Sequence, residues 1–270
     1  MDLDLCGKVV IITGGAGAIG SATARCFLKE SAVVAIADVD LARGRVVEEE
    51  LTREFGANAQ FFPLDLRNEA SIRKFVHSVV ERYGGIDVIV NNAAVFFFNP
   101  LIEWSTFDNL DEHYQVGLRG PAMLVQEAWR ISERSRAGSV INVSSIAGHV
   151  GEPMAVAYTT IKAAQKGFTL SCAIEMSSYG GWAVTVSPGH TWTPAHQKRA
   201  GIKGLTREEY EQSSSNIQST MFGRFLEPEE VAEWIMLAAS RLGKPLTGQD
   251  LKVSFGIEAG GFNRQYETIL

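Results

Sequence analysis

The sequence is poor in cysteine and proline, with three and eight of these residues among 270. Cys6, Cys26 and Cys172 lie far apart and match no metal-ligand spacing, so they predict neither a disulfide framework nor a zinc site. No apolar run approaches the roughly 20 residues of a membrane-spanning helix. The first residues are acidic where a targeting peptide would be basic. We therefore expect a cytoplasmic protein without a membrane partner.

Positive charge is also scarce. The 25 Lys and Arg residues are outnumbered by 31 Asp and Glu residues, which gives a formal net charge of -6. Broad attraction to nucleic acid requires an excess of basic groups, so nucleic acid is not expected as a partner. The length and the 46% of hydrophobic residues allow one substantial core, which favours a single domain over residues 1–270.

Short β-branched runs alternate with longer helical patterns along the chain. The runs lie at 9–12, 33–37, 60–63, 86–90, 139–143, 183–187 and, more weakly, 251–254. The helical patterns lie at 19–29, 41–54, 69–83, 118–133, 157–178 and 228–239. Strands that are apolar throughout have helices on both faces, and each helix is long enough for a right-handed crossover. The alternation predicts an α/β fold with a doubly wound parallel sheet of the Rossmann type.

Residues 191–225 interrupt this alternation. The segment mixes polar and aromatic residues and follows a Pro-Gly pair after the sixth predicted strand. Long connections of this kind often cover a binding site and move when ligands enter or leave. We therefore predict a mobile substrate lid at 191–225.

A glycine-rich turn follows the first predicted strand and opens a helix. It includes Gly14, Ala18, Ile19 and Gly20. In this context the backbone N–H groups and the helix dipole can face the pyrophosphate of a dinucleotide. The alternative is that the glycines only make a tight turn from strand to helix.

Asp38 ends the second predicted strand. A carboxylate at this place can accept both ribose hydroxyls of the adenosine half, and it repels a 2′-phosphate. The glycine turn has no Lys or Arg to neutralise such a phosphate. We therefore predict NAD rather than NADP as the cofactor. The alternative is that Asp38 only caps the helix that follows.

Tyr158 and Lys162 are four positions apart at the start of a helical pattern, which places them on one face, one turn apart. A lysine ammonium favours the charged form of a neighbouring phenol. We therefore expect the pKa of Tyr158 to move from about 10 toward neutrality, where the phenol can exchange a proton. The alternative is an ordinary surface pair on a helix.

Taken in their order along the chain, these motifs resemble those of the short-chain dehydrogenase/reductase family. The resemblance runs from the glycine turn to Thr247-Gly248-Gln249. The resemblance implies that Ser145, Tyr158 and Lys162 are catalytic, and that Tyr158 and Lys162 also contact the cofactor. It implies hydride transfer between NAD and a secondary alcohol or ketone. Further cofactor-binding residues implied by the family's motifs are Asp65, Leu66, Asn92, Ala93, Pro188, Gly189, Thr191 and Thr193.

One position departs from the family pattern. Gly117 stands where the family usually carries an asparagine, whose side chain helps to hold a water between the lysine and solvent. Glycine keeps the backbone freedom for a local helix distortion, and Gln115 and His113 are candidates for the missing group. The departure leaves open the alternative of a redox-silent NAD-binding protein. A further alternative is a family member that uses bound NAD for isomerisation, dehydration or a multistep biosynthetic conversion without net turnover of NAD.

Aromatic residues and histidines near the motifs bear on the substrate. Phe96 and Phe97, in a run of three phenylalanines, and Trp192 predict a site for a small hydrophobic substrate. Packing under a loop or at a subunit contact would explain them equally well. Three histidines can either orient a substrate hydroxyl or face solvent: His149, His190 and His196. No carboxylate pair or metal-ligand spacing competes with this chemistry, so no metal is predicted.

The helical patterns at 118–133 and 157–178 carry more apolar residues than a helix with one face on a sheet requires. In the family that the sequence resembles, the equivalent helices join subunits. We therefore expect a homodimer or homotetramer. Extra burial within one subunit would give the same pattern.

Overall fold

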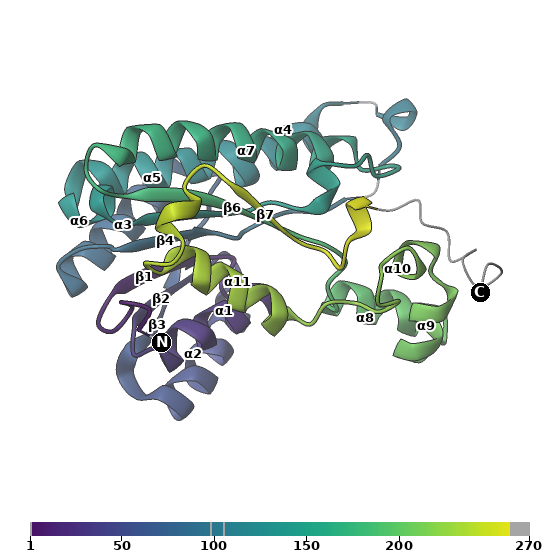
Figure 1. The fold of residues 1–270 in the computed structure, drawn as a ribbon, viewed down its shortest axis with the longest axis horizontal. Coiled ribbons are helices and arrows are strands. Elements are labelled where there is room, and N and C mark those ends of the chain that lie inside the picture. Colours follow the sequence, from purple (N-terminus) through teal and green to yellow (C-terminus); the bar gives the residue numbers. More distant parts are fainter. Residues whose placement is uncertain (1, 98, 105, 260–270) are drawn as a thin grey trace.

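The computed structural model describes residues 2–97, 99–104 and 106–259. In these ranges a seven-stranded parallel sheet has the strand order β3-β2-β1-β4-β5-β6-β7, and it lies between two layers of helices (Figure 1). This confirms the predicted doubly wound sheet. Its strands are β1 (Val9–Thr13), β2 (Val33–Asp38), β3 (Ala59–Pro63), β4 (Val88–Asn91), β5 (Ser139–Val143), β6 (Trp182–Pro188) and β7 (Asp250–Val253).

Each face of the sheet has its own hydrophobic core, because successive strand residues point to opposite faces. Val10 and Ile12 of β1 belong to the core under α1 (Ala18–Lys29), α2 (Leu41–Phe55) and α11 (Pro228–Ala239). Val9 and Ile11 belong to the core under α3 (Glu69–Tyr83), α5 (Gly120–Ile131) and α7 (Val156–Ser177). Both cores are apolar, so the strands read as continuous hydrophobic runs.

Helix starts follow ordinary capping chemistry. The side chain of Asp40 accepts a hydrogen bond from the backbone N–H of Arg43 at the start of α2, at 2.9 Å. Asn68 accepts one from the N–H of Ser71 at the start of α3, at 3.2 Å. These bonds satisfy N–H groups that a helix cannot pair internally. Among the described helices, none combines the length and apolar character needed to cross a membrane.

The region before α5 differs from the prediction of one helix over 118–133. The chain is already helical in α4 (Asp108–Tyr114), passes through a π-helical turn at Gln115–Arg119, and enters α5 at Gly120. After α5 ends at Ile131, a short helix α6 (Glu133–Ala137) follows. A π-turn inserts one residue and rotates the helix faces. The hydrophobic periodicity therefore breaks at this turn, and the sequence pattern did not reveal the helix before it.

The predicted lid segment contains three short helices after β6: α8 (Pro194–Ile202), α9 (Arg207–Ser213) and α10 (Ser215–Gln218). They lie beyond the carboxyl ends of the strands in Figure 1. Ala200, Tyr210 and Ile217 of these helices and Phe225, which follows α10, form a small third core, separate from the two cores of the sheet. At the base of the segment, Thr191 forms a parallel bridge with Leu226.

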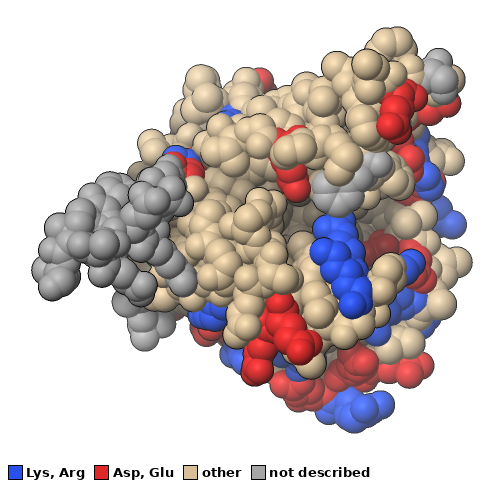
Figure 2. All heavy atoms as spheres, turned by 90° about the vertical axis from the view of Figure 1, so that its right-hand side faces the viewer, with Lys and Arg blue, Asp and Glu red and all other residues tan. Residues whose placement is uncertain are grey.

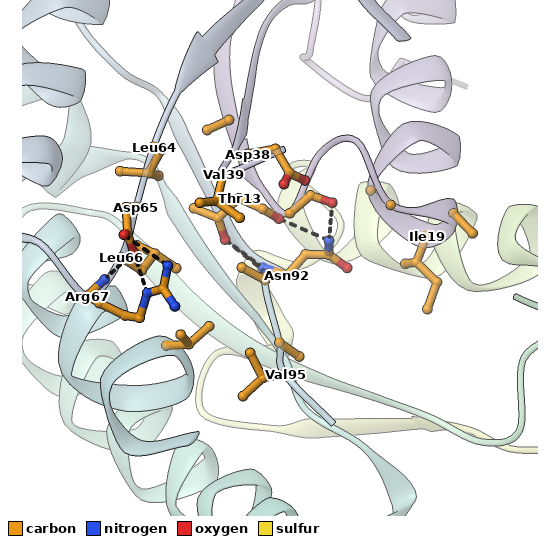
Figure 3. Close-up of a pocket in the computed structure, with 18 of the residues that line it drawn as sticks. Thr13, Ile19, Asp38, Val39, Leu64, Asp65, Leu66, Arg67, Asn92 and Val95 are labelled. Carbon is orange, nitrogen blue, oxygen red and sulfur yellow. Dashed lines mark hydrogen bonds and ion pairs between the residues drawn. The ribbon is translucent and has the colours of Figure 1, made fainter. Parts of the chain in front are cut away.

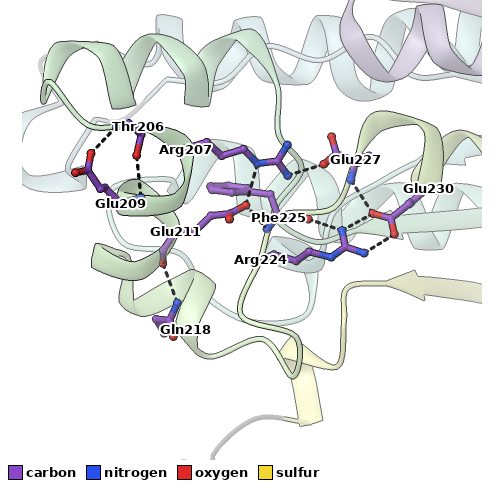
Figure 4. A network of polar contacts seen from close by, with 9 residues as sticks. All are labelled: Thr206, Arg207, Glu209, Glu211, Gln218, Arg224, Phe225, Glu227 and Glu230. Atoms are coloured by element: carbon purple, nitrogen blue, oxygen red, sulfur yellow. Dashed lines mark hydrogen bonds and ion pairs between the residues drawn. The ribbon is translucent and has the colours of Figure 1, made fainter.

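Two arginine–glutamate clusters tie this segment to the start of α11 (Figure 4). Arg207 of α9 binds Glu211 at 3.1 Å and Glu227 at 2.5 Å. Arg224 binds Glu230 of α11 through two N–H···O bonds of 2.7 and 2.8 Å. Bidentate pairs hold both partners in a fixed orientation. The segment is therefore anchored at its C-terminal end to a helix that also covers the sheet.

Candidate active site

Two adjoining cavities lie at the carboxyl ends of the strands. The β1–β3 cavity, of about 410 Å³, is lined by the glycine turn and the ends of β2 and β3. The Tyr158 cavity, of about 600 Å³, is lined by Ser145, Tyr158, Lys162 and the segment after β6. Four residues line both, which makes one continuous cleft: Ile19, Asn92, Ala94 and Thr193. Ligands of doubly wound sheets bind in such a crevice.

The glycine turn brings its backbone close to neighbouring segments. Gly14 has φ of +63°, and a Cβ placed there would lie 2.8 Å from the Cα of Ala93. A Cβ on Gly20 would lie 2.2 Å from the carbonyl oxygen of Gly14. Only glycine fits these two places. Helix α1 begins directly after the turn, at Ala18, and its N-terminus therefore borders the β1–β3 cavity.

Asn92 fixes this turn to the end of β4. Its side-chain amide donates to the carbonyl oxygens of Thr13 and Gly14 at 2.9 and 3.1 Å (Figure 3). In return, the Thr13 hydroxyl accepts from the backbone N–H groups of Asn92 and Ala93, at 3.0 and 3.1 Å. Four hydrogen bonds therefore hold the floor of the cleft in one shape.

Asp38 lies at the end of β2 and lines the β1–β3 cavity. Its carboxylate accepts from the backbone N–H groups of Ala16 and Asp40, both at 3.0 Å. A carboxylate has about four lone-pair positions. Two fixed bonds therefore orient Asp38 and leave it able to accept the two hydroxyls of a ribose.

Arg67, which was not predicted from the sequence, also lines this cavity. Arg67 binds the carboxylate of Asp65 through Nε at 2.9 Å and Nη2 at 3.1 Å, and its Nη1 lies 3.3 Å from Glu112 (Figure 3). The hydrogen bond from Arg67 lowers the pKa of Asp65. Asp38, Asp65 and Glu112 outnumber this one guanidinium in the cavity lining, so the local charge stays negative.

The structure brings the three predicted catalytic side chains together. Ser145 follows β5, and its hydroxyl accepts from the N–H of Ala147 at 3.1 Å and is hydrogen-bonded to Tyr158. The ammonium of Lys162 lies 5.6 Å from the centre of the Tyr158 ring and donates to the carbonyl oxygen of Val143 at 2.7 Å. The other predicted cofactor residues also line the cleft: Leu66, Ala93, Pro188, Gly189, Thr191 and Thr193.

The protein alone shifts the pKa of Tyr158 in the direction opposite to the sequence-based expectation. Burial raises the pKa of Tyr158 to about 12; the hydrogen bond with Ser145 lowers it, and the charge of Glu152 raises it. Burial lowers the pKa of Lys162 to about 7. Both groups lose water, and removal from water disfavours a charged form. The expected fall in the pKa of Tyr158 is therefore wrong for the protein by itself.

The buried lysine makes stability depend on pH. Burial lowers the pKa of Lys162 from its ordinary value of 10.5 to about 7 in the folded protein. Between these values the unfolded chain binds more protons, so the free energy of unfolding should increase as the pH rises from 7 toward 10. Urea denaturation of the cofactor-free protein at pH 7 and 9 measures this increase. Lys162→Met should weaken the pH dependence, and equal slopes for the two proteins would contradict the assignment.

Comparison with known proteins identifies the family. A family model described as Enoyl-(Acyl carrier protein) reductase matches residues 14–258. L-fucose dehydrogenase of Bos taurus is 34% identical over 257 residues, covering 94% of this chain and 90% of the relative. The chain belongs to the short-chain dehydrogenase/reductase family. It is therefore an oxidoreductase by family, as its motifs predicted.

Other family members support the same assignment along the whole chain. Galactitol 2-dehydrogenase of Agrobacterium fabrum is 31% identical over 254 residues, which cover 92% of this chain and 96% of that protein. The solved structure of gox2181 is similar with a TM-score of 0.86 at 26% identity, and the match covers 96% of this chain and 98% of that one. The predicted fold is thus confirmed by a known structure.

Gly117, the position that departs from the short-chain dehydrogenase/reductase pattern, lies inside the π-helical turn. Its carbonyl oxygen accepts a hydrogen bond of 2.8 Å from the side-chain amide of Gln165, a residue of α7 that is only 2% exposed. A Cβ at position 117 would lie 2.6 Å from Cγ2 of Ile161. Gln165 was not predicted from the sequence, because its partner lies 48 positions away and no local pattern pairs the two.

Replacing Gln165 with leucine should destabilise the protein by about 1–3 kcal/mol. Leucine has a similar volume but cannot donate, so the carbonyl of Gly117 would lose its side-chain donor in a buried turn. The urea midpoint reports the change. Gln197→Leu, on the exposed side of α8, is a matched control that should stay within about 0.5 kcal/mol of the wild type. A Gln165→Leu midpoint equal to that control would contradict the prediction.

Three of the candidate substrate residues reach the Tyr158 cavity. Phe96, His190 and His196 line it, and the Phe96 ring packs edge-on against Tyr158 with ring centres 4.7 Å apart. Phe98, the third phenylalanine of the run, lies outside the described residues. Phe96 therefore forms an aromatic wall beside the predicted proton donor, and Tyr210 and Phe225 also line the cavity.

The structure does not bring the other three predicted substrate residues into this cavity. Phe97 is 44% exposed. The ring of His149 is hydrogen-bonded to Asp250 of β7 at 2.8 Å, which holds it against the edge strand. Trp192 packs on Phe225 in the small third core, with ring centres 5.1 Å apart. Nearness to a motif in the sequence did not show which way these side chains turn.

Proposed function

We propose that the protein is an NAD(H)-dependent dehydrogenase or ketoreductase that interconverts a secondary alcohol and a ketone. One observation carries the proposal: a single cleft has a fixed carboxylate, Asp38, at one end and Ser145, Tyr158 and Lys162 at the other. This arrangement suits an elongated dinucleotide whose adenosine half lies near β2. The nicotinamide half would then lie near Tyr158.

The residues of the β1–β3 cavity fit NAD better than NADP. The glycine turn and the N-terminus of α1 would hold the pyrophosphate, and Asp38 would accept hydrogen bonds from the adenosine ribose. A 2′-phosphate would lie against a carboxylate. The only described cation in the lining, Arg67, is already bound by Asp65 and faces Glu112. These charges support the preference for NAD.

The side chains of the Tyr158 cavity can exchange the proton. Bound NAD supplies the hydride acceptor. Ser145 can donate a hydrogen bond to the substrate oxygen, and Tyr158 takes the hydroxyl proton during oxidation or returns it during reduction. The pKa of about 12 keeps Tyr158 protonated, ready for reduction. For oxidation, the protonated form of Lys162 and the charge of the oxidised nicotinamide both favour the phenolate.

We favour a polar substrate over the small hydrophobic one expected from the sequence. Among the described aromatic residues behind that expectation, only Phe96 lines the Tyr158 cavity, which also holds charged side chains. Two relatives are named for a sugar and a hexitol: L-fucose dehydrogenase and galactitol 2-dehydrogenase. Their names support an alcohol with additional hydroxyl groups.

Formation of NADH tests the proposed function. The protein is mixed with NAD and a broad panel of polar and hydrophobic secondary alcohols, and NADH absorbance should rise with at least one. A flat trace throughout, together with tight NAD binding by calorimetry, would contradict the proposal and favour a redox-silent protein. Product analysis with catalytic amounts of NAD would reveal isomerisation, dehydration or a multistep conversion instead.

We also propose that the protein is a cytoplasmic homodimer or homotetramer joined through α5 and α7. On α7, Leu170 and Ile174 are 52% and 74% exposed, which is unusual for large apolar side chains. A second subunit would cover them. The cysteines are all unpaired, as suits a reducing compartment. The mass in solution, from light scattering, tests the assembly.

A further inference from the structure

One wall of the Tyr158 cavity carries polar groups that the proposed proton exchange does not use. Glu152 comes from the segment before α7, His190 from the segment after β6, and His196 and Arg199 from α8. We call these four side chains the polar wall. Figure 2 looks onto the edge where the strands end, and both acidic and basic side chains border a hollow there.

Both imidazoles of the polar wall are neutral at pH 7. Burial lowers the pKa of His190, and it lowers that of His196 to about 4; the charge of Arg199 acts in the same direction on each. A neutral imidazole has one N–H donor and one lone pair. Nδ1 of His196 is buried without a hydrogen-bond partner among the described residues. Because buried polar atoms are normally paired, this nitrogen is suited to a polar ligand.

Glu152 and Arg199 add opposite charges to the same wall. Burial raises the pKa of the Glu152 carboxyl, and the charge of Arg199 lowers it. The Arg199 guanidinium lies 5.6 Å from the centre of the Phe96 ring, so the wall meets the aromatic side of the cavity. Lys203 lines the same cavity and adds a further positive charge. Charged groups of both signs therefore face a ligand, with the described cations in excess.

A molecule with several hydroxyl groups matches this wall. Each hydroxyl both donates and accepts, as the mixture of carboxylate, guanidinium and neutral imidazole requires. An apolar ligand would desolvate these groups without pairing them. We propose that the substrate is a polyhydroxylated secondary alcohol, a sugar or polyol, whose additional hydroxyls bind Glu152, His196 and Arg199. This inference rests on the proposed function, because it names the substrate class of the same site.

Initial rates with NAD test the substrate class. Hexitols and hexoses are compared with 2-hexanol and cyclohexanol, which have the same number of carbons. Sites built to bind a hydroxyl discriminate strongly against an analogue that lacks it, so kcat/KM for the best polyol should exceed that for either simple alcohol by at least roughly 10²-fold. Faster oxidation of 2-hexanol than of every polyol would overturn this inference and leave the proposed function standing.

Binding separates the two proposals if no alcohol is oxidised. The hexitols and hexoses are then titrated calorimetrically into the NAD-loaded protein. Saturable binding that His196→Phe weakens would support the polar wall, although the proposed dehydrogenase activity would have failed. Absence of binding by every polyol would overturn the inference.

Variants of the polar wall give the sharper readout. His196→Phe should raise KM for the best polyol about tenfold, while kcat and the KM for NAD change little, because the residue would bind a remote hydroxyl. His196→Asn keeps a polar atom near the Nδ1 position and should recover most of the loss. Lys198→Met, on the exposed side of α8, is the control. An unchanged polyol KM in both His196→Phe and Glu152→Gln would contradict the assignment.

Discussion

Tyr158→Phe should lower kcat by roughly 10²–10⁴-fold, the usual contribution of a positioned proton donor. Phenylalanine keeps the ring that packs against Phe96, so the cavity should keep its shape. It removes the hydroxyl that is hydrogen-bonded to Ser145 and that would exchange a proton with the substrate. Steady-state rates with the best alcohol measure the loss, and NAD binding by calorimetry should change by no more than a few-fold.

The control for this variant is Tyr179→Phe. Tyr179 is 56% exposed, and its ring lies against Arg136, away from the cleft. The same chemical change there should leave kcat unaltered. If Tyr158→Phe retained full activity, proton exchange by this phenol would be refuted. The reaction would then need another proton donor in the Tyr158 cavity, and His190 would be the first to examine.

Asp38→Ser should shift the cofactor preference toward NADP by roughly 10²–10³-fold in the ratio of the two kcat/KM values. Two unit charges 4 Å apart interact by about 4 kcal/mol at an effective dielectric constant near 20, and each 1.4 kcal/mol is about tenfold. Serine removes the charge that would oppose the 2′-phosphate. It also removes the acceptor for the ribose hydroxyls, so kcat/KM with NAD should fall.

Asp40→Ser is a matched control for Asp38→Ser. It removes the same charge two residues away, at a residue outside the cavity lining, and serine can still cap α2. The cofactor ratio should therefore move little in Asp40→Ser. Equal shifts in the two variants would show that general surface charge sets the preference, rather than the fixed carboxylate of Asp38.

Much of the fold was predictable because both faces of the sheet are covered. A strand buried on both faces is mostly apolar, so residues 9–12 of β1 and 33–37 of β2 read as continuous hydrophobic runs in the sequence. The glycine turn was equally readable, since the close approach of Gly14 and Gly20 to other backbone atoms excludes any side chain. In each case a strong steric or hydrophobic demand acts on a few consecutive residues.

The less predictable features depend on contacts between distant segments. Gln165 supports the π-helical turn from another helix, across 48 positions of the sequence. Arg67 lines the β1–β3 cavity because the end of β3 lies beside the end of β2. The pKa of Tyr158 depends on how much water packing removes. No local pattern in the sequence encodes these relations. The sequence therefore predicted the identity of the site residues better than it predicted their contacts and their exposure to water.

The pairing of Thr191 with Leu226 closes the base of the three-helix segment. Both ends are therefore held at one place on the sheet, and the residues between them form an insert that supplies His196 and Arg199 to the cavity. Such an insert can be exchanged as a block without disturbing the strands beneath it. Chimeras that swap 194–222 between relatives are thus a direct route to new substrate preferences on an unchanged dinucleotide-binding frame.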